Sequence, residues 1–371
     1  MKITRILTYP VEPRWLFVKV ETDTDIFGWG ECLGDKAHVN AEAVRSYEHA
    51  LVGEDPRRIV HHWQSLYRFG FWRGGPTLCA AISGIEMALW DILGKSLNAP
   101  IYQLLGGPTR ERIRVYRHFG GKTPQETASS ARQMAEAGFT ALKMAIHSTV
   151  HILEHYAVVE AEVARFAAAR EAVGSGVDIM IDFHGRVSPA MAVVLEEALR
   201  PYHPFFIEEP VLPENVDALA QVARQFKTPI ATGERLFTKW GFREVLEKGA
   251  ASVLQPDPCI CGGILEATHI AAMAETYYAA IAPHNAYGPI NLAAAIQIDA
   301  CIPNFLVQEW VHLGEGYLRR PFEIKNGYIE LPTAPGLGIE VDEEFLKTRP
   351  LAPRPDVGRL FHADDNSVAD W

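Results

Sequence analysis

The chain from residue 113 onward alternates short apolar runs with longer stretches of helical periodicity. Strand–helix alternation of this kind predicts parallel βα units, and eight strands with seven intervening helices suffice to close a barrel. The expected strands are 113–117, 141–146, 177–182, 204–208, 229–233, 251–255, 279–283 and 305–309. The expected helices are 125–137, 155–173, 188–200, 213–226, 238–248, 262–276 and 288–299.

The first part of the chain has a different pattern. Residues 1–34 carry β-forming residues and a polar turn, which predict strands, and residues 40–66 and 76–104 have helical periodicity. Gly106-Gly107-Pro108 ends this block. We therefore expect an α/β fold, a modified TIM-like (β/α)-barrel preceded by a small α+β domain. The expected division is 1–110 for the α+β domain, 111–317 for the barrel, and 318–371 for a C-terminal segment that packs back on the first domain.

Composition narrows the class of protein. The 371 residues are 48% hydrophobic and 22% charged, with a net charge of −11 and no long acidic run, which argues against a nucleic-acid surface. The N-terminus lacks the apolar core of a signal peptide, and no apolar run approaches the length of a membrane span. Five scattered cysteines do not suggest a disulfide framework. A cytoplasmic enzyme is the default expectation.

Acidic or histidine residues follow the expected strands at nearly even steps. A βα unit takes roughly that many residues, and the C-terminal ends of barrel strands are where such a fold builds its active site. The steps are 26, 26, 23, 27 and 25 residues, and they join Asp182, Glu208, Glu234, Asp257, His284 and Glu309.

Three of these residues are metal-ligand candidates. Asp182, Glu208 and Glu234 follow consecutive strands, and carboxylates without a cysteine among them suit a hard divalent cation such as Mg²⁺. Each acid alone could instead cap the helix after its strand, but three in register favour a metal. Glu209 adjoins Glu208, and strand alternation allows only one of them to face the barrel interior.

The histidines suggest acid–base chemistry. His284 and Asp257 end adjacent strands, so the carboxylate can fix the histidine tautomer and make His284 a general base, although a structural pair is the alternative. His184 lies two residues after Asp182 on the same side and could be a general acid. The remaining twelve histidines are expected to be solvated. Lys143, inside a strand, could bind a carboxylate or enolate oxygen, or form a salt bridge with a metal-binding acid.

These motifs resemble the enolase superfamily, mandelate racemase subgroup, and within it the D-galactonate dehydratases. The resemblance runs nearly end to end. It includes Pro13-Arg14-Trp15, Phe71-Trp72-Arg73-Gly74-Gly75-Pro76, Asp182-Phe183-His184-Gly185-Arg186, Ile207-Glu208-Glu209-Pro210, Gly233-Glu234-Arg235, Gln255-Pro256-Asp257, Ala282-Pro283-His284, Gln308-Glu309 and the tail Asp365–Trp371.

The resemblance implies a reaction and a set of roles. Mg²⁺, one per subunit, would be bound by Asp182, Glu208 rather than Glu209, and Glu234. His284, paired with Asp257, would take the C2 proton of D-galactonate, and water would leave to give 2-dehydro-3-deoxy-D-galactonate. The first domain would be a lid that chooses the substrate through loops near 12–38 and 70–76. His184 would protonate the leaving C3 hydroxyl, Glu309 would hydrogen-bond the enediolate, and Lys143, Arg14 and Trp72 are candidate substrate contacts.

The chain departs from the family pattern at several positions, which leaves other substrates open. The second lysine of the racemase K-x-K triplet is replaced by Ala145, which argues against a two-base racemase or epimerase. Asn285, Tyr287 and Trp310 also differ. A dehydratase of gluconate, arabinonate or a 6-deoxy acid sugar is therefore the closest alternative, and a non-catalytic metal-binding barrel is more distant. The expected partners are a small acid sugar and further copies of the chain.

Overall fold

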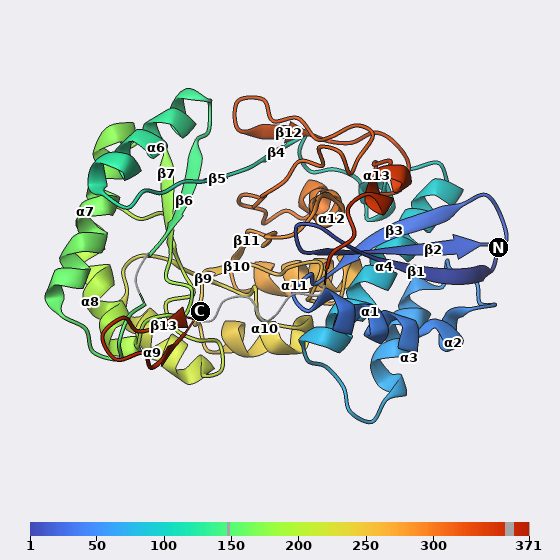
Figure 1. The fold of residues 1–371 in the computed structure, drawn as a ribbon, viewed down its shortest axis with the longest axis horizontal. Helices are drawn as coiled ribbons and strands as arrows, with labels where there is room; N and C mark the ends of the chain where they lie inside the picture. Colours follow the sequence, from blue (N-terminus) through green and yellow to red (C-terminus); the bar gives the residue numbers. More distant parts are fainter. Residues whose placement is uncertain (147–148, 353–359, 371) are drawn as a thin grey trace.

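The computed structural model describes residues 1–146, 149–352 and 360–370. Its N-terminal part is an antiparallel sheet in the order β1-β2-β3, with helices on one side (Figure 1). The strands are β1 (Ile3–Val11), β2 (Trp15–Thr22) and β3 (Phe27–Cys32). The helices are α1 (Ala37–Ser46), α2 (Glu48–Leu51), α3 (Ile59–Phe69), α4 (Pro76–Ser96) and α5 (Ile101–Leu104).

Helix α4 is the core of this part. Gly28 and Gly30 on β3 let the sheet approach the helix backbone closely, since a Cβ at either position would lie 1.9 Å from the carbonyl oxygen of Ala88 or Gly84. Within the described residues, α4 alone is long and apolar enough to cross a membrane, but 83% of its most apolar window is buried inside the protein. That burial is typical of a core helix.

The second part is a parallel barrel. Seven strands pair in the order β11-β10-β9-β8-β7-β6-β5. Single parallel bridges from residues 305 and 308 to Ile281 and Val115 close the ring. The strands are β5 (Arg117–His118), β6 (Ala141–Ala145), β7 (Asp178–Asp182), β8 (Ile207–Glu208), β9 (Ile230–Thr232), β10 (Val253–Leu254) and β11 (Ala280–Ile281). This confirms the expected fold class.

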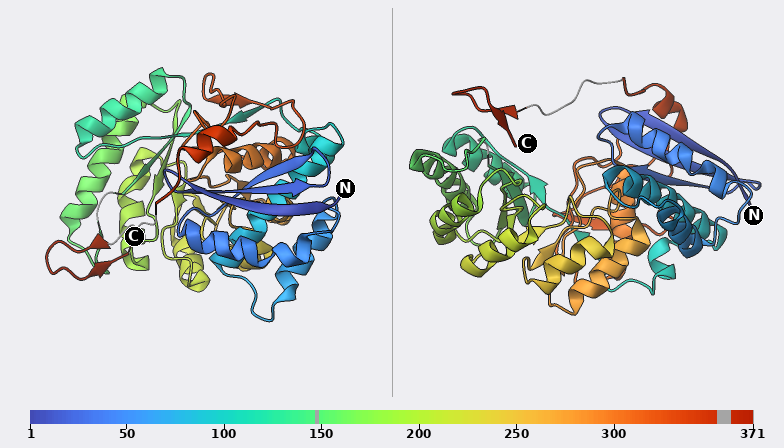
Figure 2. Two further views of the ribbon diagram at one scale, coloured as in Figure 1. Left: turned by 45° about the vertical axis from the view of Figure 1, so that its right-hand side comes forward. Right: turned by 90° about the horizontal axis from the view of Figure 1, so that it is seen from below.

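The barrel helices lie outside the strands (Figures 1 and 2). Several of them begin with a capping side chain or with a proline in the first turn. Thr123 and Glu126 form a capping box at the first of them, Ser188 and Asn215 cap two others, and proline occupies the first turn of three. The helices are α6 (Pro124–Glu136), α7 (Tyr156–Val173), α8 (Pro189–Leu199), α9 (Val216–Gln225), α10 (Thr238–Glu247), α11 (Ile264–Glu275) and α12 (Pro289–Cys301).

One buried side chain from each strand position fills the barrel. Three of these side chains are alanines and five are larger, and all are buried, so the barrel interior is a packed core. The layer consists of Tyr116, Ala141, Met180, Phe206, Ala231, Val253, Ala282 and Val307.

The C-terminal segment makes two kinds of contact. Strand β12 (Tyr328–Glu330) pairs with β4 (Arg112–Arg114), and the stretch around α13 (Glu343–Lys347) returns to the first sheet through the Lys19–Glu343 ion pair. The hairpin β13 (Leu360–Phe361) and β14 (Val368–Ala369) lies instead beside the barrel loop after β6, where Asp364 contacts His151 (Figure 2). The boundaries at 110 and 317 stay a prediction.

Two buried glutamates join the first part to the barrel. Glu31 on β3 accepts hydrogen bonds from Gly288 N (2.6 Å) and Asn291 N (2.8 Å), and so caps α12. Glu86 on α4 accepts from the backbone of Ile264 (2.8 Å), and so caps α11. Burial raises the pKa of each carboxyl to about 8, although these N–H bonds oppose the shift.

Two expected helices are interrupted. The stretch 40–66 is divided into α1, α2 and α3, because Pro56 cannot continue a helix and Asp55 hydrogen-bonds its own turn. The stretch 76–104 becomes α4 and α5, separated around Pro100. The eighth strand, expected at 305–309, is present only as the bridges that close the barrel.

Replacing Glu31 with glutamine should destabilise the protein. The amide keeps one acceptor oxygen but presents an NH₂ group to a backbone N–H, so one buried donor loses its partner. We expect Glu31→Gln to lower the free energy of unfolding by about 1–3 kcal/mol, measured by urea denaturation. Glu323→Gln, at a side chain 77% exposed, is the matched control. An unchanged midpoint for Glu31→Gln would show that the cap does not stabilise the junction.

Candidate active site

The polar residues of the site stand directly above the packed layer inside the barrel. Strand residues two positions apart face the same side, so each buried layer residue is followed by an inward-facing residue at the C-terminal end of its strand. The pairs are Tyr116 and His118, Ala141 and Lys143, Met180 and Asp182, Phe206 and Glu208, Ala282 and His284, and Val307 and Glu309.

Lys143 lies between two of the carboxylates. Its Nζ is 2.8 Å from both oxygens of Glu208 and 2.9 Å from Oε1 of Glu309. Burial alone would lower the pKa of this ammonium group, but the two glutamates raise it well above its ordinary value. Lys143 is therefore a buried cation in a salt bridge, and one of its partners is a candidate metal ligand.

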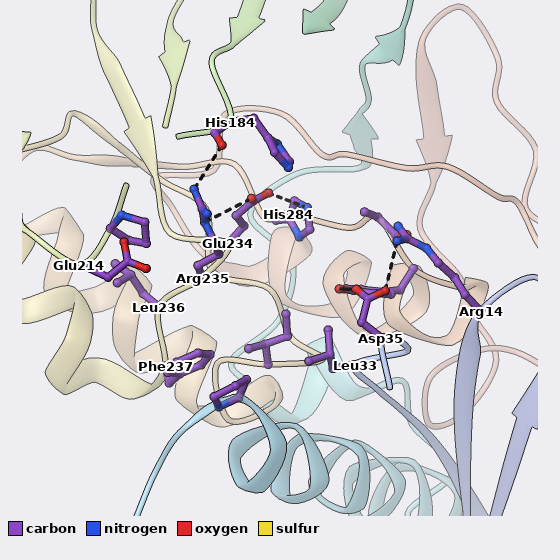
Figure 3. A pocket seen from close by; sticks show the side chains of 15 residues that line it. Arg14, Leu33, Asp35, His184, Glu214, Glu234, Arg235, Leu236, Phe237 and His284 are labelled. Atoms are coloured by element: carbon purple, nitrogen blue, oxygen red, sulfur yellow. Dashed lines mark hydrogen bonds and ion pairs between the residues drawn. The ribbon is translucent and has the colours of Figure 1, made fainter. Parts of the chain in front are cut away.

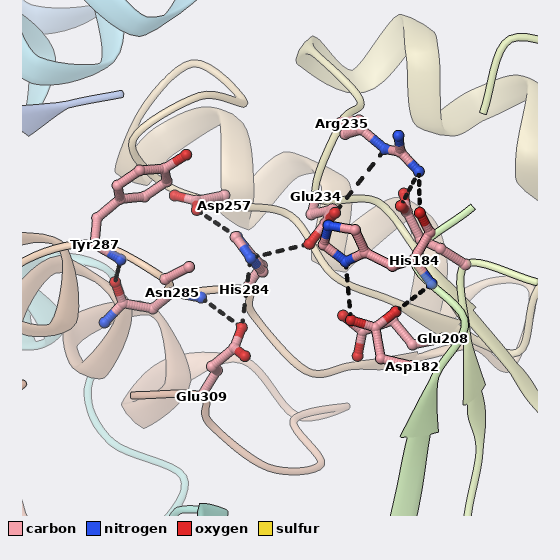
Figure 4. A network of polar contacts seen from close by, with 12 residues as sticks. Asp182, His184, Glu208, Glu234, Arg235, Asp257, His284, Asn285, Tyr287 and Glu309 are labelled. Atoms are coloured by element: carbon pink, nitrogen blue, oxygen red, sulfur yellow. Dashed lines mark hydrogen bonds and ion pairs between the residues drawn. The ribbon is translucent and has the colours of Figure 1, made fainter. Parts of the chain in front are cut away.

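The other two candidate ligands contact histidines (Figure 4). Asp182 accepts from the backbone N of His184 (2.7 Å) and lies 3.1 Å from its Nδ1. Glu234 Oε2 is 3.0 Å from Nε2 of His284. The three carboxylates thus face the site, each held by a basic group.

Glu208 and Glu209 point in different directions, as strand alternation requires. Glu208 faces Lys143 in the barrel interior, whereas Glu209, with a φ of +38°, forms an ion pair with Arg235. Burial raises the pKa of Glu208 to about 8; Lys143 opposes this shift, and the charges of Asp182, Glu309 and Glu234 add to it. Of the two glutamates, Glu208 therefore lies within the group of carboxylates.

His284 is held in a defined orientation. Its Nδ1 lies 2.6 Å from Oδ2 of Asp257, whose other oxygen accepts from Asn291 Nδ2 (2.9 Å) and from Cys259 N (2.8 Å). The remaining ring nitrogen, Nε2, therefore faces Glu234 and the cavity. Burial would lower the pKa of His284, but Glu309, Glu234 and Asp257 together raise it well above its ordinary value.

The sequence interpretation missed several residues of the site. His118 was expected to be solvated, but its Nε2 lies 2.7 Å from Oε1 of Glu309. Outside the site, His62 was also expected to be solvated, but it is only 2% exposed and its Nε2 lies 2.8 Å from the carbonyl oxygen of Asp55. The position of His118, two residues after the buried Tyr116, is the same signal that identifies His284 after Ala282. Asn291 and Arg235 lie on a helix and a loop, where no strand spacing points to them.

A cavity of about 540 Å³ opens beside the two histidines (Figure 3). His184, His284 and Glu234 line one side, and Arg14, Asp35 and Tyr287 line another. The walls between them are mainly apolar and include Leu33, Leu236, Phe237 and Ile260. The cavity is therefore shaped by both parts of the chain.

Three of the residues singled out from the sequence do not line this cavity. Trp72 is 84% exposed and does not line this cavity. Asn285 is fully buried, and its Oδ1 accepts from Asn291 Nδ2 (3.0 Å). Trp310 packs on Phe139 outside the barrel core. Arg14 and Tyr287 do line the cavity.

Comparisons with known proteins identify the family. The family model described as "Enolase C-terminal domain-like" matches residues 126–345, and "Mandelate racemase / muconate lactonizing enzyme, N-terminal domain" matches residues 8–106. The chain belongs to the enolase superfamily. Proteins named D-galactonate dehydratase from Ralstonia nicotianae (strain ATCC BAA-1114 / GMI1000) and Ralstonia pickettii (strain 12J) are each 44% identical over the full length of both chains.

A solved structure agrees with this assignment to the superfamily. The mandelate racemase/muconate lactonizing enzyme from Sulfitobacter sp. is 35% identical, with a TM-score of 0.93 and 100% of each chain covered. The likeness therefore includes both the first domain and the barrel. The candidate metal ligands Asp182, Glu208 and Glu234 and the two histidines lie in the part that matches the superfamily's C-terminal model.

The donor set fits the Mg²⁺ that superfamily members typically bind. Three buried carboxylates supply only oxygen atoms, which a hard cation prefers, and their mutual repulsion contributes to the raised pKa of Glu208. A tighter group, with ligand atoms all within 4.8 Å of one another, occurs among the described residues at His151, His362 and Asp364. The two imidazole rings there are stacked 3.8 Å apart at 16°, so their in-plane lone pairs do not converge.

The pKa of His284 should depend on Asp257. Asparagine cannot supply the negative charge that stabilises the imidazolium, so Asp257→Asn should lower the pKa of His284. An NMR titration of ¹⁵N-histidine-labelled protein, assigned with His284→Asn, measures the change. Asp217→Asn, at a side chain 73% exposed, should leave the pKa unaltered. An unchanged pKa in Asp257→Asn would mean that the 2.6 Å contact does not govern the basicity of this ring.

Proposed function

We propose that the chain is a Mg²⁺-dependent dehydratase that converts D-galactonate to 2-dehydro-3-deoxy-D-galactonate. The observation that carries this proposal is the placement of two histidines, one bound to Asp257 and one bound to Asp182, around a group of buried carboxylates beside one cavity. The full-length likeness to two D-galactonate dehydratases shows a hydro-lyase of the acid-sugar dehydratase kind. D-galactonate, Mg²⁺, a homo-oligomer and a cytoplasmic location are proposed.

The first step is removal of the C2 proton by His284. In its neutral form the ring carries its proton on Nδ1, because Asp257 Oδ2 accepts a hydrogen bond there. This leaves the Nε2 lone pair directed into the cavity to accept the proton. The imidazolium that results is stabilised by Asp257 and by the nearby Glu234 and Glu309.

The second step is departure of the C3 hydroxyl as water. His184 lines the same cavity, and its left-handed backbone (φ +56°) turns the ring back onto Asp182. The contact with Asp182 orients the ring, and in this proposal His184 gives a proton to the leaving oxygen. A positioned acid or base contributes roughly 10²–10⁴-fold to such a step.

The remaining charged groups stabilise the negative charge that develops on the substrate carboxylate. Asp182, Glu208 and Glu234 would bind Mg²⁺, which when bound supplies Lewis-acid stabilisation of that charge. Lys143 adds a fixed positive charge. Glu309 is held at the same end of the barrel by His118 and by Asn285 N (3.0 Å); as an ionised carboxylate it accepts hydrogen bonds, and it would need to take up a proton to donate one to the enediolate. Preorganised electrostatic groups of this kind supply the largest share of many barriers.

The position of Ala145 supports elimination over racemisation. Ala145 pairs with Asp182 in the parallel register between β6 and β7, so its side chain lies beside the group of carboxylates. A second base on this strand would have to occupy that position, and alanine offers none. A racemase or epimerase of the two-base type is therefore disfavoured, whereas other acid sugars remain alternatives to D-galactonate.

Activity should require a divalent cation and an acid sugar. After treatment with EDTA, the protein should not release 2-keto-3-deoxy product from D-galactonate, and Mg²⁺ should restore activity. A semicarbazide assay across a library of acid sugars measures both points. Full turnover by protein shown to contain no metal would contradict the cation requirement. If another acid sugar has a kcat/KM at least about tenfold higher, which corresponds to about 1.4 kcal/mol in transition-state binding, the assignment of D-galactonate as the substrate is wrong. The assignment of the chain as a dehydratase would not be affected.

The two histidines should have separable roles. His284→Asn should abolish both dehydration and exchange of the C2 hydrogen with D₂O, because no other base replaces Nε2. His184→Asn should abolish dehydration but retain C2 exchange, since His284 and the cation site are intact. Proton NMR of D-galactonate in D₂O measures exchange, and His203→Asn, at an exposed position, is the control. Normal dehydration by His184→Asn would assign the acid to another residue.

A further inference from the structure

Three polar residues form a connected group where the first domain meets the barrel. Asp35 lies in the loop before α1, and Tyr287 lies in the loop after β11. The Tyr287 hydroxyl donates to Asp35 Oδ2 (3.1 Å), and Arg14 Nη1 lies 3.4 Å from Asp35 Oδ1. Arg14 Nη2 also donates to the carbonyl of Ala286 (3.2 Å). All three side chains line the cavity, on a wall apart from the histidines (Figure 3).

Tyr287 fixes the distance of this group from the catalytic base. Its ring lies 6.3 Å from the His284 ring, measured between centroids, in an edge-on arrangement. The tyrosine is 5% exposed, and its backbone N donates to Asn285 Oδ1 (3.2 Å). The Asp35 carboxylate, 44% exposed, is therefore held at the cavity wall by a rigid barrel residue.

The charges of this wall favour a neutral ligand group. Arg14 is paired with Asp35, and the other arginine of the cavity, Arg235, is paired with Glu209. Among the described lining residues, no cation is therefore left to bind a second carboxylate, and Glu214 adds another negative charge. A hydroxyl group, in contrast, can donate to Asp35 and accept from Arg14 at the same time.

The apolar walls of the cavity suit the carbon chain of a sugar. Leu33, Ile260 and Phe237 line the same cavity as the histidines and the polar group. An extended acid sugar with its reacting end at His284 would contact such apolar side chains. Its far end would then reach Arg14 and Asp35.

We propose that Arg14, Asp35 and Tyr287 form a subsite that binds the terminal hydroxyl of the acid sugar and excludes a second carboxylate. Asp35 accepts the hydroxyl proton, Arg14 donates to the hydroxyl oxygen, and Tyr287 positions Asp35. The enzyme consequently takes aldonates, with one carboxylate, and rejects aldarates, with two. This inference rests on the proposed dehydratase function and adds the recognition of the end of the substrate remote from the chemistry.

A comparison of substrates that differ only at C6 tests this subsite. D-galactonate carries a hydroxyl there, 6-deoxy-D-galactonate carries a hydrogen, and galactarate carries a carboxylate in place of the hydroxymethyl group. For the wild type we expect kcat/KM for D-galactonate to exceed that for 6-deoxy-D-galactonate by at least about tenfold, since polar groups that the bound substrate covers would lose a partner. Galactarate should be turned over still less.

Variants then assign the discrimination to named side chains. Asp35→Asn should lower kcat/KM for D-galactonate by about 10- to 100-fold, the range for a hydrogen bond to a charged group, but alter that for 6-deoxy-D-galactonate by less than about threefold. Tyr287→Phe should show the same substrate dependence with a smaller effect. Asp25→Asn and Tyr278→Phe, both at exposed positions, are the matched controls and should leave both values unchanged.

The outcomes separate this inference from the function on which it rests. The proposed subsite is wrong if Asp35→Asn lowers kcat/KM equally for the two monoacids, or if kcat/KM for galactarate equals that for D-galactonate. Neither result would contradict the proposed dehydratase function. If the wild type dehydrates another acid sugar but none of the three compounds, both the assignment of D-galactonate as substrate and the proposed subsite are wrong. A decrease in kcat/KM that occurs for D-galactonate but not for 6-deoxy-D-galactonate supports the subsite, because a purely structural defect would lower kcat/KM for both monoacids.

Discussion

The site depends on the two-residue period of a closed barrel. Every strand position contributes one side chain to a packed interior layer, and the next inward-facing position on six of them carries an acidic, lysine or histidine side chain. Because the strands are parallel, these groups emerge at one end, where Lys143, Asp182, Glu208, His284 and Glu309 converge. The packed layer beneath them prevents the charged side chains from turning into the core, so the geometry of the site follows from the packing of apolar residues.

The same constraint explains what the sequence could predict. The even spacing of Asp182, Glu208, Glu234, Asp257, His284 and Glu309 sufficed to expect a barrel with a site at its C-terminal end, and the fold class is confirmed. His118 could have been found from the same rule, but its strand is short and β5 has only two residues. Contacts between distant loops, such as Tyr287 with Asp35, carry no periodic signal. Trp72 lies in a matching motif but is exposed, so its role as a substrate contact stays a prediction.

The buried negative charges of the site are paired with basic side chains. The barrel mouth gathers six buried carboxylates, at positions 182, 208, 209, 234, 257 and 309, and the structure pairs them with three histidines, a lysine and an arginine. Unpaired buried charges would cost several kcal/mol each. A bound divalent cation would add to this compensation at Asp182, Glu208 and Glu234, and it would free His184 and His284 for proton transfer. At the junction, the buried Glu31 and Glu86 of the first domain accept hydrogen bonds from the N-termini of two barrel helices.

A crystal structure of His284→Asn with Mg²⁺ and D-galactonate would test the central claim most directly, because this variant can bind substrate without consuming it. The account predicts one cation among Asp182, Glu208 and Glu234. It predicts C2–H directed at residue 284 and the C3 hydroxyl within hydrogen-bond distance of His184. A cation bound elsewhere, or a sugar whose C2 and C3 face away from these two positions, would contradict the arrangement proposed for the reaction.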